Sequence, residues 1–249
     1  VVGVSFAKSL ALALDVPIIE VNHMKGHVLA HFIENPETHP PKFPFICLTV
    51  SGGHTQLVRV ESHYVMEVIG STIDDAAGEA FDKAAKMIGI EYPGGPKLDE
   101  YAQNGDPLKF KFAKPKVADL NFSFSGLKTS ILYNLKDWQK EEHGFIQNNF
   151  NELCASIRHT IVDILMDKLE QASIQVHKEL NGTTAGCGPA HRIAPIASYT
   201  KIPTDRLLSI AIEEAAITHY HKDAGNCSAI MALLCRYLIE GNSWKESKE

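Results

Sequence analysis

The stretch Phe45 to Val60 has the sequence F-I-C-L-T-V-S-G-G-H-T-Q-L-V-R-V, and the rest of the chain is organised around it. Two apolar, β-branched runs, Phe45–Val50 and Gln56–Val60, flank the turn S-G-G-H-T. A Gly-Gly pair between such runs predicts a β-hairpin, because glycine reaches the positive φ that tight turns demand. The same turn exposes consecutive backbone N–H groups without a Cβ, which suits phosphate oxygens. A plain hairpin and an anion-binding hairpin both remain open.

Composition and charge indicate a soluble globular protein with one large domain or two small ones. The chain has 249 residues, of which 45% are hydrophobic and 22% are charged. Its 24 Lys and Arg against 30 Asp and Glu give a formal charge of −6. Because binding to a nucleic acid depends on neutralised phosphates, this balance argues against a protein that grips one alone over a broad face.

The cysteines and the apolar segments indicate a cytoplasmic chain. Five cysteines without a C-x-x-C spacing predict reduced thiols. No apolar run approaches the ~20 residues that would span a bilayer, so we expect no membrane partner. The first residues, V-V-G-V, enter an apolar segment abruptly, as though the chain began within a domain.

Apolar periodicity and turn residues predict a mixed α/β order of elements. Asn22 is expected to cap the second helix, and Thr72 or Asp74 the third. The expected helices are Val4–Leu14, His23–Phe32, Ala76–Ile88, Lys97–Asn104, Gly126–Leu135, Phe150 to about Leu180, Arg206–Tyr220 and Ser228–Glu240. The expected strands are Ile18–Val21, Phe45–Val50, Gln56–Val60 and Tyr64–Ile69.

The sequence H-M-K-G-H places His23 and His27 at i and i+4, on one face of a helix start, where the two imidazoles are able to share a metal ion. His31 continues the spacing. The alternative is that these are ordinary exposed or core histidines, and a metal site would still need a third ligand from elsewhere, such as a carboxylate.

Carboxylates crowd the segment before and inside the third helix. Asp74, Asp75 and Glu79 fit the favourable electrostatics of a helix N-terminus. Asp82 lies further along, where a carboxylate more often faces a ligand or a lysine. Downstream, the second glycine turn Y-P-G-G-P is followed by Asp99, and two glycine turns with nearby carboxylates suggest a nucleotide cleft.

Two other groups of residues give weaker indications of a functional site. Ser51 and His54 lie three apart on a tight turn without an orienting acid, which argues against a nucleophile and its base. Four lysines between Lys109 and Lys116 are interleaved with Phe110 and Phe112. These residues would contact an RNA backbone and stack a base, or would form a solvated loop.

Five motifs occur in one order: V-N-H-M-K-G-H, T-V-S-G-G-H-T-Q-L, A-G-E-A-F-D-K, Y-P-G-G-P and F-S-F-S-G-L-K-T-S. This set resembles the bacterial form of the tRNA N6-threonylcarbamoyladenosine transferase family, over roughly Val1 to Leu180. The resemblance implies an actin-like, Hsp70-like or sugar-kinase-like α/β fold with two lobes. Residues 1–70 would be the remainder of an incomplete first lobe, with the metal helix and the S-G-G hairpin. Residues 71–249 would be a largely helical second lobe that diverges after 181.

The resemblance also implies the reaction and the site. The threonylcarbamoyl group of L-threonylcarbamoyladenylate would pass to N6 of adenosine 37 in tRNAs reading ANN codons, with release of AMP. His23 and His27 would bind one divalent ion, Fe²⁺ or Zn²⁺, and no residue is assigned as catalytic. The substrate-binding residues would be Thr49, Val50, Ser51, Gly52, Gly53, Asp82, Gly95 and Asp99.

The sequence departs from the family pattern at both ends. The family has a strand-rich segment ahead of V-G-V-S-F-A-K. After the long helix it has G-G-V-x-x-N and T-D-N-A-A-M, where this chain reads T-T-A-G-C-G-P-A-H-R-I-A-P and A-G-N-C-S-A-I-M-A. The adenylate-contacting Asn and the Asp that is the third metal ligand have no counterpart, and Asp223 and Asn226 are not assigned their roles. A reading-frame change near Asn181 is one hypothesis for this loss.

The sequence also indicates which partners to expect and leaves three alternative functions open. The resemblance implies a scaffold paralogue and small ATPase subunits as partners, and the charge of −6 predicts that such partners share in tRNA binding. The rivals are a non-catalytic scaffold paralogue, an inactive fragment of the same family, and an ATPase or sugar kinase of the same fold. The H-x-x-x-H pair ahead of the hairpin argues against the last.

Overall fold

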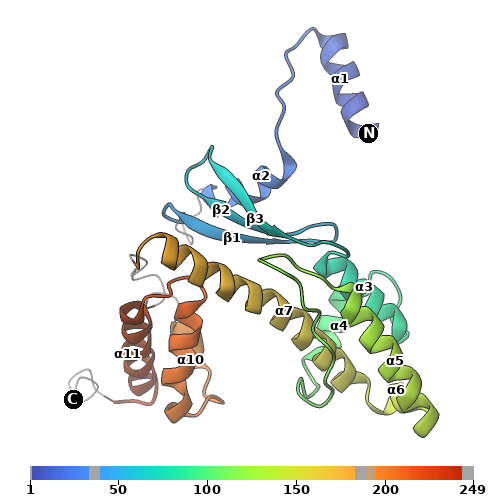
Figure 1. Cartoon of the computed structure of the whole chain (residues 1–249), viewed down its shortest axis with the longest axis vertical. Helices are drawn as coiled ribbons and strands as arrows, with labels where there is room; N and C mark the ends of the chain where they lie inside the picture. The colour runs from blue at the N-terminus through green and yellow to red at the C-terminus, as the bar shows by residue number, and fades with distance from the viewer. Residues whose placement is uncertain (1, 34–39, 183–189, 191–192, 243–249) are drawn as a thin grey trace. The chain divides into compact units, whose positions relative to one another are not determined.

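A computed structural model describes residues 2–33, 40–182, 190 and 193–242 (Figure 1). The chain divides into two compact units. The first unit is Val1–Phe45 with Val60–Met66, and the second is Ile46–Arg59 with Glu67–Glu249. No helix among the described residues is long and apolar enough to cross a membrane.

The first unit contains two helices, a 3₁₀ turn and a cluster of aromatic rings. Its elements are α1 (Val2–Leu14), α2 (His23–Leu29) and η1 (Ala30–Phe32). The ring of Phe32 stacks on that of Phe43 at 5.1 Å between centroids, and His63 lies 4.6 Å from Phe32 and 4.8 Å from Phe43. These rings tie η1 to the segments around Phe43 and His63.

The prediction of a buried strand at Ile18–Val21 is wrong. This segment has no strand assignment, and Ile18 and Ile19 are 55% and 83% exposed. A strand needs a neighbour for its backbone hydrogen bonds, and the one sheet among the described residues consists of three other segments. β-branched composition alone therefore misidentified an extended, exposed connection.

The second unit is built around a three-stranded sheet in the order β1-β2-β3. The strands are β1 (Phe45–Val50), β2 (Thr55–Val60) and β3 (Met66–Ser71), which confirms the predicted hairpin and its third strand. A parallel bridge between Thr72 and Phe122 continues the pairing beyond β3. The motif F-S-F-S therefore lies alongside the end of the sheet.

Helices of the second unit form the main hydrophobic core together with side chains of the sheet. They are α3 (Ala77–Met87), α4 (Gly95–Ala102), α5 (Ser125–Glu141), α6 (Phe145–Asn148) and α7 (Phe150–Glu179). The core includes the fully buried Leu57 of β2, Phe122 and Ile157 of α7. Because α7 contacts both α3 and α4, the predicted 30-residue core helix fixes the two helices that follow the glycine turns.

Three further helices, α9 (Ala194–Ser198), α10 (Thr204–Ala216) and α11 (Lys222–Ile239), pack on one another around a second small core. The side chain of Arg236 is buried in this cluster and donates to the carbonyl oxygens of Ala197, Tyr199 and Ile202. Together with a longer bond of 3.5 Å from Nη1 to Thr204 Oγ1, these bonds supply acceptors to a buried guanidinium.

Candidate functional site

The histidine pair lies at the start of α2, and the local sequence explains how it is placed. The side chain of Asn22 accepts a hydrogen bond from the Lys25 N–H at 3.0 Å, which confirms the predicted N-cap. The helix that begins there brings the Nε2 atoms of His23 and His27 to 3.1 Å from each other. Both rings are exposed, so a ligand can reach them.

This separation fits two ligands on one metal ion. With bonds of about 2.0–2.1 Å, a tetrahedral ion holds two ligand nitrogens about 3.3 Å apart. Without a metal, one neutral imidazole donates to the other at the same distance. Among the described residues, no group of three or more His, Cys, Asp or Glu side chains is arranged to hold a metal. The pair therefore supplies two ligands, and the third is not found in the described part of the chain.

The S-G-G turn is closed by its serine. The backbone N–H of Ser51 donates to the His54 carbonyl at 2.8 Å, and the His54 N–H donates to Ser51 Oγ at 3.0 Å. Gly52 and Gly53 are exposed, and a Cβ at either would meet nothing within 4 Å. The turn therefore presents open backbone, as an anion-binding hairpin requires.

The predicted reason for the two glycines is wrong. Neither Gly52 nor Gly53 has a positive φ; among the described glycines that conformation occurs at Gly89, Gly144, Gly182 and Gly241. The contact of this turn with α3 instead explains a third glycine, Gly78. A Cβ on Gly78 of α3 would lie 2.8 Å from Gly52 Cα and 2.9 Å from the Ser51 oxygen. Two backbones meet here, and side chains are excluded from that contact.

The residues that precede the turn differ in exposure. Thr49 is 8% exposed and Val50 is 44% exposed, as alternation along β1 requires. Sγ of Cys47 lies 3.9 Å from Thr49 Oγ1. Of the two residues ahead of the S-G-G turn, Val50 presents its side chain to solvent and Thr49 presents its side chain to protein.

Asp82 holds the second glycine turn by its backbone. Its Oδ1 accepts from the N–H groups of Gly94 and Gly95, each at 2.9 Å. A Cβ on Gly94 would lie 2.4 Å from the Ala85 Cβ, so this glycine is required by the packing of the turn on α3. The predicted partner of Asp82 was a ligand or a lysine, and in the structure its Oδ1 contacts two amides.

Asp99 lies one helical turn after Gly95, on α4, and pairs with Arg158 of α7. Arg158 Nη1 lies 3.0 Å from Asp99 Oδ1, and Nη2 donates to the Ala102 carbonyl at 3.3 Å. Arg158 thus anchors both the carboxylate and the last turn of α4. Arg158 was not predicted from the sequence, because a single arginine on a long core helix carries no local signal.

Asp74 caps a helix other than the one predicted for it. It accepts from Ser123 Oγ and from the N–H groups of Phe124 and Ser125, at the start of α5. Partial burial on its own would raise the pKa of Asp74, but these hydrogen bonds outweigh it and lower the pKa. α3 is capped instead by Thr55, whose Oγ1 accepts from the Ala77 N–H at 2.9 Å.

The aromatic residues of the lysine-rich loop are unsuited to stacking a base. Phe112 is 8% exposed, and Phe110 packs against Trp138 and Phe145. Lys114 forms ion pairs with Asp163 and Asp167 of α7, so part of the positive charge is already neutralised. The solvated-loop interpretation applies to the lysines, while the two phenylalanines belong to the core.

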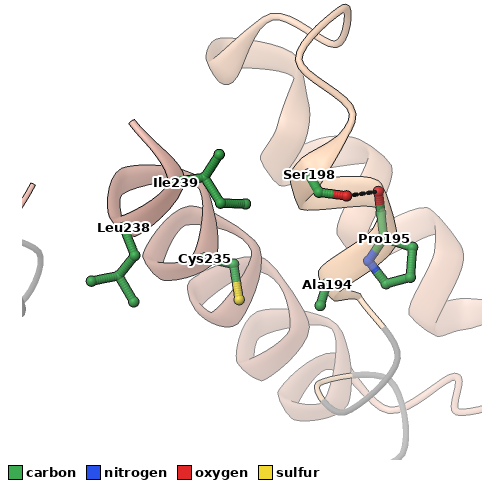
Figure 2. Close-up of a pocket in the computed structure, with 6 residues that line it drawn as sticks. All are labelled: Ala194, Pro195, Ser198, Cys235, Leu238 and Ile239. Atoms are coloured by element: carbon green, nitrogen blue, oxygen red, sulfur yellow. Dashed lines mark hydrogen bonds between the residues drawn. The ribbon is translucent and has the colours of Figure 1, made fainter. Parts of the chain in front are cut away.

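A hollow of about 550 Å³ lies between α9 and α11 (Figure 2). It is lined by Ala194, Pro195, Ser198, Cys235, Leu238 and Ile239. None of the predicted site residues contributes to it. The predicted substrate-binding residues gather on β1, the two glycine turns, α3 and α4, and α3 connects the two turns directly.

The described residues thus form a mixed α/β protein with two glycine turns on one helix. Residues 1–194 match the family model described as tRNA N6-adenosine threonylcarbamoyltransferase. Proteins of that name from Christiangramia forsetii, Phocaeicola vulgatus and Porphyromonas gingivalis are 58%, 57% and 56% identical to the chain over 171, 174 and 174 residues. The alignments cover 69% of this chain and 50%, 51% and 51% of those relatives.

The chain belongs to the tRNA N6-adenosine threonylcarbamoyltransferase family, as its motifs predicted. This family has the actin-like, Hsp70-like and sugar-kinase-like class of α/β fold. The chain spans about half the length of the curated relatives it matches. The family match ends at residue 194, so α10 and α11 lie outside it.

Proposed function

We propose that this chain takes part in t6A formation: transfer of the threonylcarbamoyl group of L-threonylcarbamoyladenylate to N6 of adenosine 37 in tRNAs reading ANN codons, with release of AMP. The observation that carries the proposal is the 3.1 Å approach of the His23 and His27 Nε2 atoms, in a chain of this family. A scaffold paralogue that only binds the true transferase has no need of such a pair.

The adenylate is assigned to the two glycine turns and the helices that follow them. The N–H groups of Gly52 and Gly53 would donate to phosphate oxygens, that of Gly53 in place of its 3.4 Å bond to Ser51 Oγ, with Thr49, Val50 and Ser51 beside them. Asp82 and Gly95 would contact the nucleoside, and Asp99 would accept from a ribose hydroxyl. Support comes from the open backbone at the first turn and from the common mounting of both turns on α3.

His23 and His27 are the ligands proposed for one divalent ion, Fe²⁺ or Zn²⁺. When bound, such an ion supplies Lewis acidity for the carbonyl of the mixed anhydride and for its AMP leaving group. The protein itself contributes no side-chain nucleophile, because the adenosine amine is the attacking group. His23 and His27 would hold the ion, and the N–H groups of the S-G-G turn would bind the phosphate of the departing AMP.

The larger assembly is proposed from the family. Residues 1–70 would belong to the first of two lobes and residues 71–249 to the second. A scaffold paralogue and small ATPase subunits would be partners in the cytoplasm, where they would share in binding tRNA. The net charge of −6 supports this sharing, since phosphate contacts dominate affinity for RNA. A tight, salt-sensitive complex of this chain alone with tRNA would refute it.

The direct test is a t6A-forming assay with L-threonylcarbamoyladenylate and tRNA, with the Christiangramia forsetii relative as the positive control. We expect t6A from the chain when the partner subunits are present, and loss of it in His23→Ala and His27→Ala. Metal content by mass spectrometry should fall in both variants and stay unchanged in His31→Ala, the matched control. A wild-type chain that holds no iron or zinc would favour the scaffold alternative.

A further inference from the structure

The first glycine turn is held against the start of α3. Gly52 and Gly53 are exposed and contact no side chain on their Cβ side. Thr55, two residues after them, is fully buried at 0% exposure, and its Oγ1 accepts from the Ala77 N–H at 2.9 Å. This bond satisfies the first N–H of α3, whose N-cap residue Ala76 has no side-chain acceptor.

A second bond joins the same two segments at the next residue. The Gly78 N–H donates to the Ser51 carbonyl at 3.2 Å, and the missing Cβ of Gly78 lets Gly52 lie against the helix backbone. The turn and the helix start are thus joined by two hydrogen bonds and one close backbone contact. Any residue larger than glycine at 78 would push them apart, because the blocking atoms are backbone.

The same helix holds the second turn. Asp82 lies four residues beyond Gly78 and receives the N–H groups of Gly94 and Gly95. α3 is therefore the element that sets the separation between the two glycine turns. The affinity for a ligand that contacts both turns would therefore depend on that separation.

We propose that Thr55 and Gly78 are positioning residues that fix the S-G-G turn on α3 at the spacing from Gly95 that an adenylate requires. This inference rests on the proposed function for the identity of the ligand. Neither residue is among those assigned to contact it. Thr55 acts through its hydroxyl and Gly78 through the absence of a side chain.

The test measures AMP binding to the full chain by calorimetry in four single variants. Thr55→Val keeps the shape but removes the acceptor, and Thr55→Ser restores the acceptor. Gly78→Ala adds the blocking Cβ. Thr129→Val is the matched control, because Thr129 is exposed on α5 and its hydroxyl bonds only to the Ser125 carbonyl of its own helix.

We expect Thr55→Val and Gly78→Ala to weaken AMP binding about tenfold or more, because a displaced turn would lose a hydrogen bond to the charged phosphate. Thr55→Ser should bind within about threefold of wild type, and Thr129→Val should be unchanged. Metal content at the histidine pair should be equal in all four, which separates local displacement from unfolding. Wild-type affinity in Thr55→Val would overturn the inference.

Amide exchange at residues 51–54 separates this inference from the proposed function. If the wild-type chain does not bind AMP, the proposed function fails for this chain, while the positioning role is still decided. Faster exchange at 51–54 in Thr55→Val, with recovery in Thr55→Ser, would support the positioning role. Equal exchange in wild type and Thr55→Val would overturn it.

Discussion

At the scale of single residues, one carboxylate oxygen organises the second glycine turn. Asp82 Oδ1 receives two backbone N–H groups that otherwise would lie half-buried without an acceptor. We expect Asp82→Ala to lower the free energy of unfolding by about 1–3 kcal/mol, the usual cost of leaving buried donors unsatisfied. Asp82→Asn keeps an oxygen at that position and should lose less. Urea denaturation of the three proteins checks the order, and equal losses in both variants would contradict it.

The cysteines allow a second prediction from residue environment. Burial raises the pKa of the Cys154 thiol to about 11, whereas Cys227 is exposed on α11. At pH 8 only roughly one part in a thousand of a thiol with such a pKa is thiolate. Iodoacetamide should therefore label Cys227 and spare Cys154 until the chain is unfolded, as peptide mass spectrometry would show. If Cys154 in the native chain were labelled as fast as Cys227, the buried environment of Cys154 would be contradicted.

At the scale of elements, Asp74 joins the end of β3 to the start of α5. Removing a cap costs about 0.5–2 kcal/mol, and we expect Asp74→Ala to fall in that range. Because the pKa of Asp74 is lowered from its ordinary value of 3.8, the unfolded chain binds its proton more readily than the folded chain. The stabilisation is therefore present above that value and is lost as the pH falls below it.

The measurement is denaturation of wild type and Asp74→Ala at several pH values. The difference in unfolding free energy should be largest near neutral pH and should shrink below about pH 4. Asp137→Ala serves as the control, since Asp137 is exposed and pairs only with Lys140 within α5. A difference that stays constant down to acid pH would show that the charge of Asp74 is not the stabilising feature.

Elements defined by local signals were predictable from the sequence. Asn22 before H-M-K-G-H predicted a capped helix start, and two β-branched runs around a Gly-Gly pair predicted the hairpin. Ile18–Val21 has the same composition as a buried strand, yet composition does not supply a pairing partner. The cap of α3 was missed for a related reason. Thr55 is 22 residues away from Ala77, and only the folded hairpin brings them together.

The site residues likewise divide into those that local sequence predicts and those that depend on contacts between distant segments. The motifs identified Gly52 and Gly53 correctly as turn residues, whereas Gly95 is the first residue of α4. The reason for Gly78 is a backbone contact visible only in three dimensions. Phe110 and Phe112 alternate with lysines in a way that suggested a nucleic-acid surface. Their burial follows from Trp138 and Phe145, which lie more than 25 residues away in sequence. In both examples, contacts between residues far apart in the sequence determine the role of the side chain, and the local sequence pattern does not show them.

At the scale of the whole molecule, the histidine pair and the glycine turns belong to different compact units of the chain. If the proposed function holds, both would act on one adenylate, and binding of the ion and binding of AMP would then be energetically linked. Linkage of this kind is reciprocal: if a bound ion tightens AMP binding, AMP tightens ion binding by the same factor. Titrations with the ion and with AMP therefore test this consequence of the proposed function without a complete enzyme.

We therefore expect Zn²⁺ to increase the affinity of the chain for AMP by a factor of about 5 to 150, the range of typical coupling free energies. Zinc is the suitable probe because it has no redox chemistry and accepts imidazole nitrogens. The effect should disappear in His23→Ala and His27→Ala and persist in His31→Ala, which lies outside the pair. AMP affinity in wild type that is identical with and without Zn²⁺ would mean that the two imidazoles and the glycine turn do not form one site. The assignment of both to a single adenylate would then fail, even if each bound its own ligand.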